Sequence, residues 1–130
     1  MFTLDQIKEA RTKVVTGEDF PKYIQEIKQF GVLYYETFVA DSHTDYFGLD
    51  NSQIKSNALY EVKHISDESD KEKFMDCLRI HQQGGTDYFT FSQDCAEAGI
   101  ERWIVRLDEM SCTYYDKLGN EILVEKIPVP

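Results

Sequence analysis

The sequence has 130 residues, 42% of them apolar and 29% charged, with a formal net charge of −10. This composition excludes a disordered chain, and the length predicts a single domain over residues 1–130 with one hydrophobic core. A surface this acidic repels phosphate backbones and anionic lipids. We therefore expect no nucleic acid and no membrane as partners.

The first helix is expected from Thr3 to about Thr16, with Gly17 after its end. Its apolar stripe of Leu4, Ile7 and Val14 includes one polar member, Arg11. A second helix is expected from Asp19, which can cap it, to the stop at Gly31. Rich β-branched and aromatic content then predicts three strands, at Val32–Val39, at Thr44–Leu49 and within Ala58–Ile65.

The second half of the sequence repeats this order of elements. Polar residues at Ser66–Asp70 start a third helix, which Gly84 and Gly85 end. Thr86 or Asp87 caps a fourth helix, which stops at Gly99. Three further strands are expected, at Ile100–Leu107, Met110–Tyr115 and Glu121–Ile127. The predicted fold class is α+β, a mainly antiparallel sheet covered by four helices.

The two halves, about 1–65 and 66–130, match at an offset of 68 residues. At this offset Asp19 falls on Asp87, Gly31 on Gly99, Tyr46 on Tyr114 and Ile54 on Ile122. The matches lie at helix caps and turns, where backbone geometry restricts the residue. Two explanations stay open, a true pseudo-repeat of ααβββ units and a chance likeness of two such units.

The cysteines Cys77, Cys95 and Cys112 are odd in number and show no CxxC spacing. We interpret them as reduced thiols in a cytoplasmic protein, since the N-terminal stretch also lacks the pattern of a signal peptide. Cys77, His81 and Cys95 are the nearest approach to a zinc site, but they fall short of four ligands. We expect no metal, and the usual nucleotide-binding motifs are absent, so we expect no cofactor.

Two segments concentrate reactive and hydrogen-bonding groups. The first is the helix-to-helix turn His81–Tyr88 and the second is the strand Cys112–Tyr115. If they meet, they form a cleft for a small ligand, with an imidazole and a carboxylate as an acid–base pair. The alternative is a self-satisfied helix corner beside a packed strand. The candidate ligand-binding residues are His81, Gln82, Asp87, Tyr88, Cys112, Thr113 and Tyr114, and no catalytic residue is assigned.

Three stretches together resemble a known family: DFPKYIQEIKQFGVLYYETFVAD, HQQGGTDYFTF and AGIERWIVRLDEMSCTYYDKLGNEILVEKIPVP. They are similar to the YbcV-like proteins, small bacterial proteins of unknown function that are sometimes labelled "phage envelope protein". The resemblance covers nearly the whole chain and implies an origin in or near prophages. The family has no established activity, so no catalytic residue is implied. His81, Gln82, Asp87, Trp103, Thr113 and Tyr114 belong to its recurring motifs.

Two functions remain open from the sequence. The first is a non-enzymatic binding or interaction module, favoured by the acidic surface, the many aromatic residues and the lack of a catalytic signature. The second is a small-ligand-binding protein or an enzyme, with its cleft between His81–Tyr88 and Cys112–Tyr115. The partner is accordingly an unknown small molecule or protein, and a homo-oligomer is left open.

Overall fold

The computed structural model describes residues 2–15 and 19–128, with the side chain of Asp50 left aside. Its strands form one six-stranded sheet in the order β3-β2-β1-β4-β5-β6, and every neighbouring pair is antiparallel. The strands are β1 (Val32–Phe38), β2 (Thr44–Gly48), β3 (Gln53–Lys55), β4 (Ile100–Arg106), β5 (Ser111–Asp116) and β6 (Glu121–Lys126). A 3-10 turn, η2 (Leu49–Asn51), joins β2 to β3.

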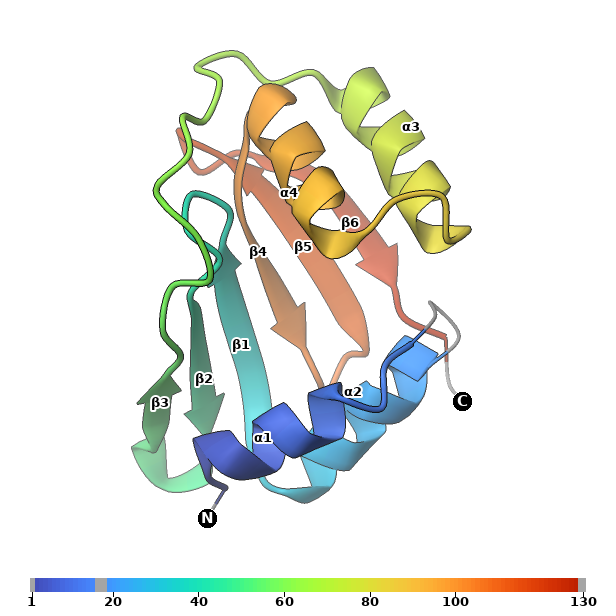
Figure 1. Cartoon of the computed structure of the whole chain (residues 1–130). Coiled ribbons are helices and arrows are strands. Elements are labelled where there is room, and N and C mark those ends of the chain that lie inside the picture. Colours follow the sequence, from blue (N-terminus) through green and yellow to red (C-terminus); the bar gives the residue numbers. More distant parts are fainter. Residues whose placement is uncertain (1, 16–18, 129–130) are drawn as a thin grey trace.

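Four helices in the described residues cover one face of this sheet, two across each half (Figure 1). They are α1 (Leu4–Arg11), α2 (Phe20–Gln29), α3 (Lys71–Gln82) and α4 (Tyr88–Glu97). The core lies between the helices and the sheet, where Phe74, Phe91, Trp103 and Tyr114 are buried together. The predicted α+β class, with a mainly antiparallel sheet covered by four helices, is confirmed.

The predicted caps of α1 and α4 are confirmed, whereas the predicted capping bond of α2 by Asp19 is wrong. The side chain of Thr3 accepts a hydrogen bond from the Gln6 amide, and that of Asp87 accepts one from the Thr90 amide. Asp19 precedes α2 as predicted, but its carboxylate accepts from the Val15 amide rather than from within the helix.

The first helix is shorter than predicted. It ends at Arg11, and the predicted end at Thr16 and Gly17 lies outside the described residues. The Thr12 hydroxyl bonds the Glu9 carbonyl at 2.6 Å, a local bond of the kind that competes with helix continuation.

The predicted third strand within Ala58–Ile65 is wrong. Instead, β3 follows β2 after the short η2 turn, and Ile54 pairs with Tyr46. Residues 56–70 form an irregular segment that passes from the sheet edge to the start of α3 (Figure 1). The amide of Lys63 donates to the Ala40 carbonyl and that of Ser66 to the Ala96 carbonyl, so this segment satisfies its backbone without joining the sheet.

The strand registers follow the 68-residue offset closely. Tyr35 pairs with Tyr46, and 68 residues later Trp103 pairs with Tyr114. In the central β1–β4 pair, Tyr35 opposes Val105 and Thr37 opposes Trp103, as a twofold relation between the halves requires. The outermost pairs differ by one residue, since Tyr114 opposes Leu123 rather than Ile122. The pseudo-repeat itself stays a prediction, to be tested by superposing the halves.

Candidate functional site

The two segments singled out from the sequence come together around a residue that the sequence did not indicate, Glu125. The Gln82 amide, at the end of α3, donates to Glu125 Oε2 at 2.8 Å. The Tyr114 hydroxyl donates to Glu125 Oε1 at 3.3 Å. Glu125 lies on β6 opposite Cys112, so it faces the helices. Only the pairing of β5 with β6 places Glu125 opposite Cys112, and no local sequence pattern predicts that pairing.

The helix corner at His81 is occupied by its own hydrogen bonds. His81 Nδ1 lies 3.0 Å from the Thr86 carbonyl, which can only accept, so this nitrogen carries the proton. The imidazole stacks on Phe91 with ring centroids 4.3 Å apart. Asp87 receives the Thr90 amide, and hydrogen bonds from Thr90 lower the pKa of its carboxyl. His81 and Asp87 therefore hydrogen-bond to residues of the same helix corner, which is the alternative to a ligand cleft considered from the sequence.

The remaining predicted residues point in different directions. Tyr88 faces the sheet, and its hydroxyl bonds that of Ser42. Thr113 lies on the opposite face of the sheet, where its hydroxyl is 3.5 Å from Arg106 Nη1. Of the predicted ligand-binding residues on β5, Cys112 and Tyr114 therefore lie on the helix-covered side of the sheet, together with Gln82 and Glu125.

The thiols are not activated. Burial raises the pKa of Cys112 to about 12 and raises the pKa of Cys95 well above its ordinary value. Burial also raises the pKa of Cys77. A thiol with a raised pKa is a poor nucleophile near neutral pH. Within residues 2–15 and 19–128, no group of three or more His, Cys, Asp or Glu side chains is placed to hold a metal ion.

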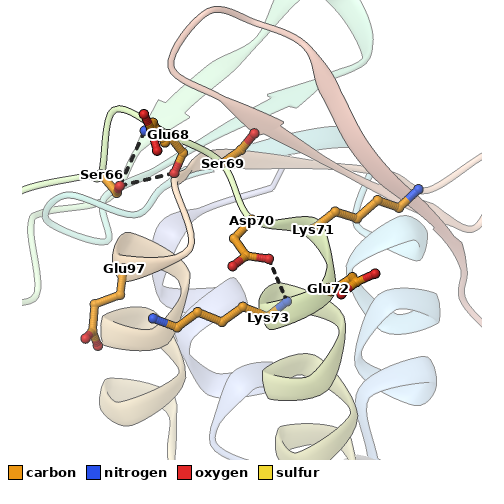
Figure 2. A pocket seen from close by; sticks show the side chains of 8 residues that line it. All are labelled: Ser66, Glu68, Ser69, Asp70, Lys71, Glu72, Lys73 and Glu97. Atoms are coloured by element: carbon orange, nitrogen blue, oxygen red, sulfur yellow. Dashed lines mark hydrogen bonds between the residues drawn. The ribbon is translucent and has the colours of Figure 1, made fainter.

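Two surface hollows lie elsewhere, beside the start of α3. Figure 2 shows the first, of about 420 Å³, with polar and charged side chains around its rim. There the Asp70 carboxylate accepts from the Lys73 amide and caps α3, while Ser66 bonds the backbone of Glu68. The lining residues are Ser66, Glu68, Ser69, Asp70, Lys71, Glu72, Lys73 and Glu97. Neither hollow includes a residue of the two predicted segments.

The face of the sheet opposite the helices, here called the open face, carries aromatic and charged side chains. Three cross-strand rows follow from the register. They are Phe47-Tyr34-Arg106-Ser111-Lys126, Asp45-Glu36-Ile104-Thr113-Val124 and Phe38-Arg102-Tyr115-Glu121. Tyr34, on the central strand β1, is 38% exposed, and Val124, on the edge strand β6, is 52% exposed.

Arg102 contacts two other side chains of the open face. Its Nε lies 3.2 Å from Glu36 Oε2, and its guanidinium lies 4.4 Å from the centroid of the Tyr115 ring. Its Nη1 is buried without a hydrogen-bond partner, and so is Oδ1 of Asp45 in the neighbouring row. In the row at the other end of the open face, Tyr34 and Phe47 stack with their ring centroids 4.5 Å apart. Buried polar atoms without partners are uncommon and call for an explanation.

Comparison with known proteins identifies a matching family. No helix in the part of the chain that the structure describes has the length and apolar character needed to span a bilayer. No curated protein matches the sequence. A family model described as "Protein of unknown function (DUF1398)" matches residues 8–126. Because this match covers most of the chain, the protein belongs to the DUF1398 family.

Proposed function

We propose that this protein is a non-enzymatic interaction module that binds a partner protein through the open face of its sheet. The observation that carries the proposal is the open face itself, a six-stranded surface with exposed Tyr34 and Val124 around two arginines. Tyrosine and arginine are the residues most often found at the centres of protein interfaces. His81 is bonded to Thr86 and Asp87 to the Thr90 amide, which favours this function over a catalytic acid–base pair at the helix corner.

The charge of the open face suggests the chemistry of the partner. The face carries four basic side chains and three acidic ones, against a net charge of −10 for the whole chain. The basic residues are Lys55, Arg102, Arg106 and Lys126, and the acidic ones are Glu36, Asp45 and Glu121. Within the described residues, Arg106 has no carboxylate within salt-bridge distance. A partner with an apolar centre and an adjacent carboxylate fits this surface.

The test begins with site-specific crosslinking. A photoreactive benzoylphenylalanine replaces Val124 on the open face or, as the control, Phe89, which is 57% exposed on α4. A protein crosslinked from position 124 and not from 89 is then purified, and its affinity for the unmodified chain is measured by calorimetry. The Arg106→Glu variant should bind that purified protein at least about tenfold more weakly, since the charge at the interface is reversed.

The matched control is Arg79→Glu, an equal charge change on the exposed side of α3. It should leave the affinity unchanged. Equal affinity of the Arg106→Glu variant and the unmodified chain would refute the proposal. So would crosslinking from position 124 only to a second copy of this chain, together with a dimer by light scattering, because the occupant would then be the chain itself.

The family resemblance bears on the biological setting. We infer a bacterial origin in or near prophages from the likeness to YbcV-like proteins, and a cytoplasmic location from the reduced thiols. A second site, for a small molecule, is retained as a proposal around His81, Gln82 and Tyr114, with Glu125 added as its acidic group. The contact of Gln82 and Tyr114 with the same carboxylate supports it.

A further inference from the structure

A second cluster of polar side chains lies on the helix-covered side of the sheet, between the end of α1 and the start of α4. Arg11 ends α1, and its guanidinium carbon lies 5.3 Å from the ring centroid of Tyr88, the first residue of α4. The phenols of Tyr23, Tyr35 and Tyr46 also lie close enough to interact electrostatically with Arg11. They come from α2, β1 and β2.

Arg11 is surrounded by protein yet reachable by water. Burial would lower the pKa of its guanidinium, but the phenols of Tyr23, Tyr88, Tyr35 and Tyr46 raise it. Arg11 nevertheless ranks among the exposed residues. In the described parts of the chain it has no carboxylate within salt-bridge distance. The guanidinium of Arg11 therefore has aromatic rings on one side, water on another and no carboxylate to neutralise it, and such a group can bind an anion.

The buried hydroxyl of Tyr23 gives independent evidence for a ligand beside Arg11. Tyr23 is only 4% exposed, and its oxygen is buried without a hydrogen-bond partner. It lies near Arg11 and Tyr46 but makes no hydrogen bond of acceptable geometry with either. Burial raises the pKa of Tyr23 and of Tyr35, so both phenols are protonated at neutral pH and can donate a hydrogen bond to an anion.

We propose that Arg11 and the Tyr23 hydroxyl form a binding site for an organic carboxylate, with the rings of Tyr88 and Tyr46 beside its apolar part. A guanidinium presents a planar pair of N–H donors that matches a carboxylate, and the phenol adds a third donor. One arginine balances one negative charge. A doubly charged phosphate would leave excess negative charge on a chain whose net charge is already −10.

The test uses acetate, hexanoate and benzoate as probes, with benzamide as the uncharged match for benzoate and inorganic phosphate as the competing anion. Binding to the full chain is followed by calorimetry and by NMR of the arginine side chains. We expect at least one carboxylate to bind saturably at millimolar concentration or below, and benzamide not to bind. Arg11→Gln should abolish this binding, while Arg79→Gln on the exposed side of α3 should leave it unchanged.

Tyr23→Phe separates a binding role from a structural one. Removing the unpartnered hydroxyl should raise the melting temperature of the ligand-free protein by about 4 °C, because a buried unsatisfied group is lost. The same change should weaken carboxylate binding about tenfold, because a hydrogen bond to a charged group is lost. Tyr34→Phe, on the open face, should do neither.

Any one of four results would overturn the site. The first is that none of the three carboxylates binds saturably. The second is binding that survives Arg11→Gln or is equalled by benzamide. The third is binding of phosphate alone, which would assign the wrong class of anion. If Tyr23→Phe stabilises the fold but leaves the affinity for the carboxylate unchanged, Tyr23 does not contact the ligand and the proposed site is wrong.

Discussion

Gly99 and Gly31 occupy corresponding positions after α4 and α2, but their surroundings differ. Both have positive φ, +81° at Gly99 and +104° at Gly31. A Cβ at Gly99 would lie 2.5 Å from the Glu68 carbonyl oxygen and 2.7 Å from the Ser69 Cα, both backbone atoms. A Cβ at Gly31 would meet nothing within 4 Å. The pair therefore separates backbone strain from steric overlap.

The expected losses follow from these two terms. An alanine held in the left-handed backbone region destabilises the folded state by about 1–2 kcal/mol. Alanine also lowers the conformational entropy of the unfolded chain relative to glycine, which offsets about 0.4–1 kcal/mol of this loss. Gly31→Ala should therefore destabilise the protein by roughly 1 kcal/mol. At Gly99 the overlap with the 68–69 backbone adds about 1–3 kcal/mol, because backbone cannot rotate away as a side chain can. Gly99→Ala should cost roughly 2–4 kcal/mol.

The assay is urea unfolding followed by the fluorescence of Trp103, the single tryptophan, which is buried in the core. The free energies of unfolding of the two variants are compared with that of the unmodified chain, with circular dichroism as a second probe. A larger loss at Gly99 than at Gly31 is the expected result. Equal losses at the two positions would refute the steric argument and show that residues 66–70 shift freely.

Three further outcomes are expected. Cys77, the one half-buried thiol, should react with an aromatic disulfide reagent before Cys95 and Cys112, and full reaction of all three in the native state would contradict their burial. Burial would raise the pKa of Asp116, but hydrogen bonds from Asn120, Leu118 and Gly119 lower it below its ordinary value. Its stabilising effect is thus present above the ordinary pKa of an aspartate and is lost as pH falls through the lower folded pKa; Asp116→Asn should flatten this loss in acid unfolding curves. His81→Ala should lower stability by about 1–3 kcal/mol, because the Phe91 stacking and the Thr86 bond are lost; an unchanged melting temperature would favour a ligand role for His81.

The sequence was informative wherever structure depends on neighbouring residues. Thr3 and Asp87 cap helices as predicted, because an N-cap bond reaches only three residues along the chain. The third strand is predicted in the wrong place because its position depends on pairing with β2 and not on its own composition. Ala58–Ile65 has strand-like composition, while the true β3 is only three residues long. The 68-residue match of Ile54 with Ile122, on β6, already pointed to the correct place.

The candidate sites depend on long-range pairing, so they were only partly predictable. Gln82 and Tyr114 were named, but Glu125 entered only through the β5–β6 register. Arg11 looked like a poor member of an apolar stripe, and its phenol neighbours come from three other elements. Alternation along the strands predicts two faces of the sheet, yet no local pattern tells which of them the helices cover.

The central pairing of β1 with β4 has a consequence for how the chain assembles. The other strand pairs join close neighbours in sequence, whereas Thr37 must find Trp103 across two helices and the segment 56–70. We expect closing so long a loop to be the slow part of folding, since its entropy is lost before the contacts form. Until it closes, each half presents an unpaired strand edge. Two chains at high concentration can therefore exchange halves, β1 of one pairing with β4 of the other, with the irregular segment 56–70 as the hinge.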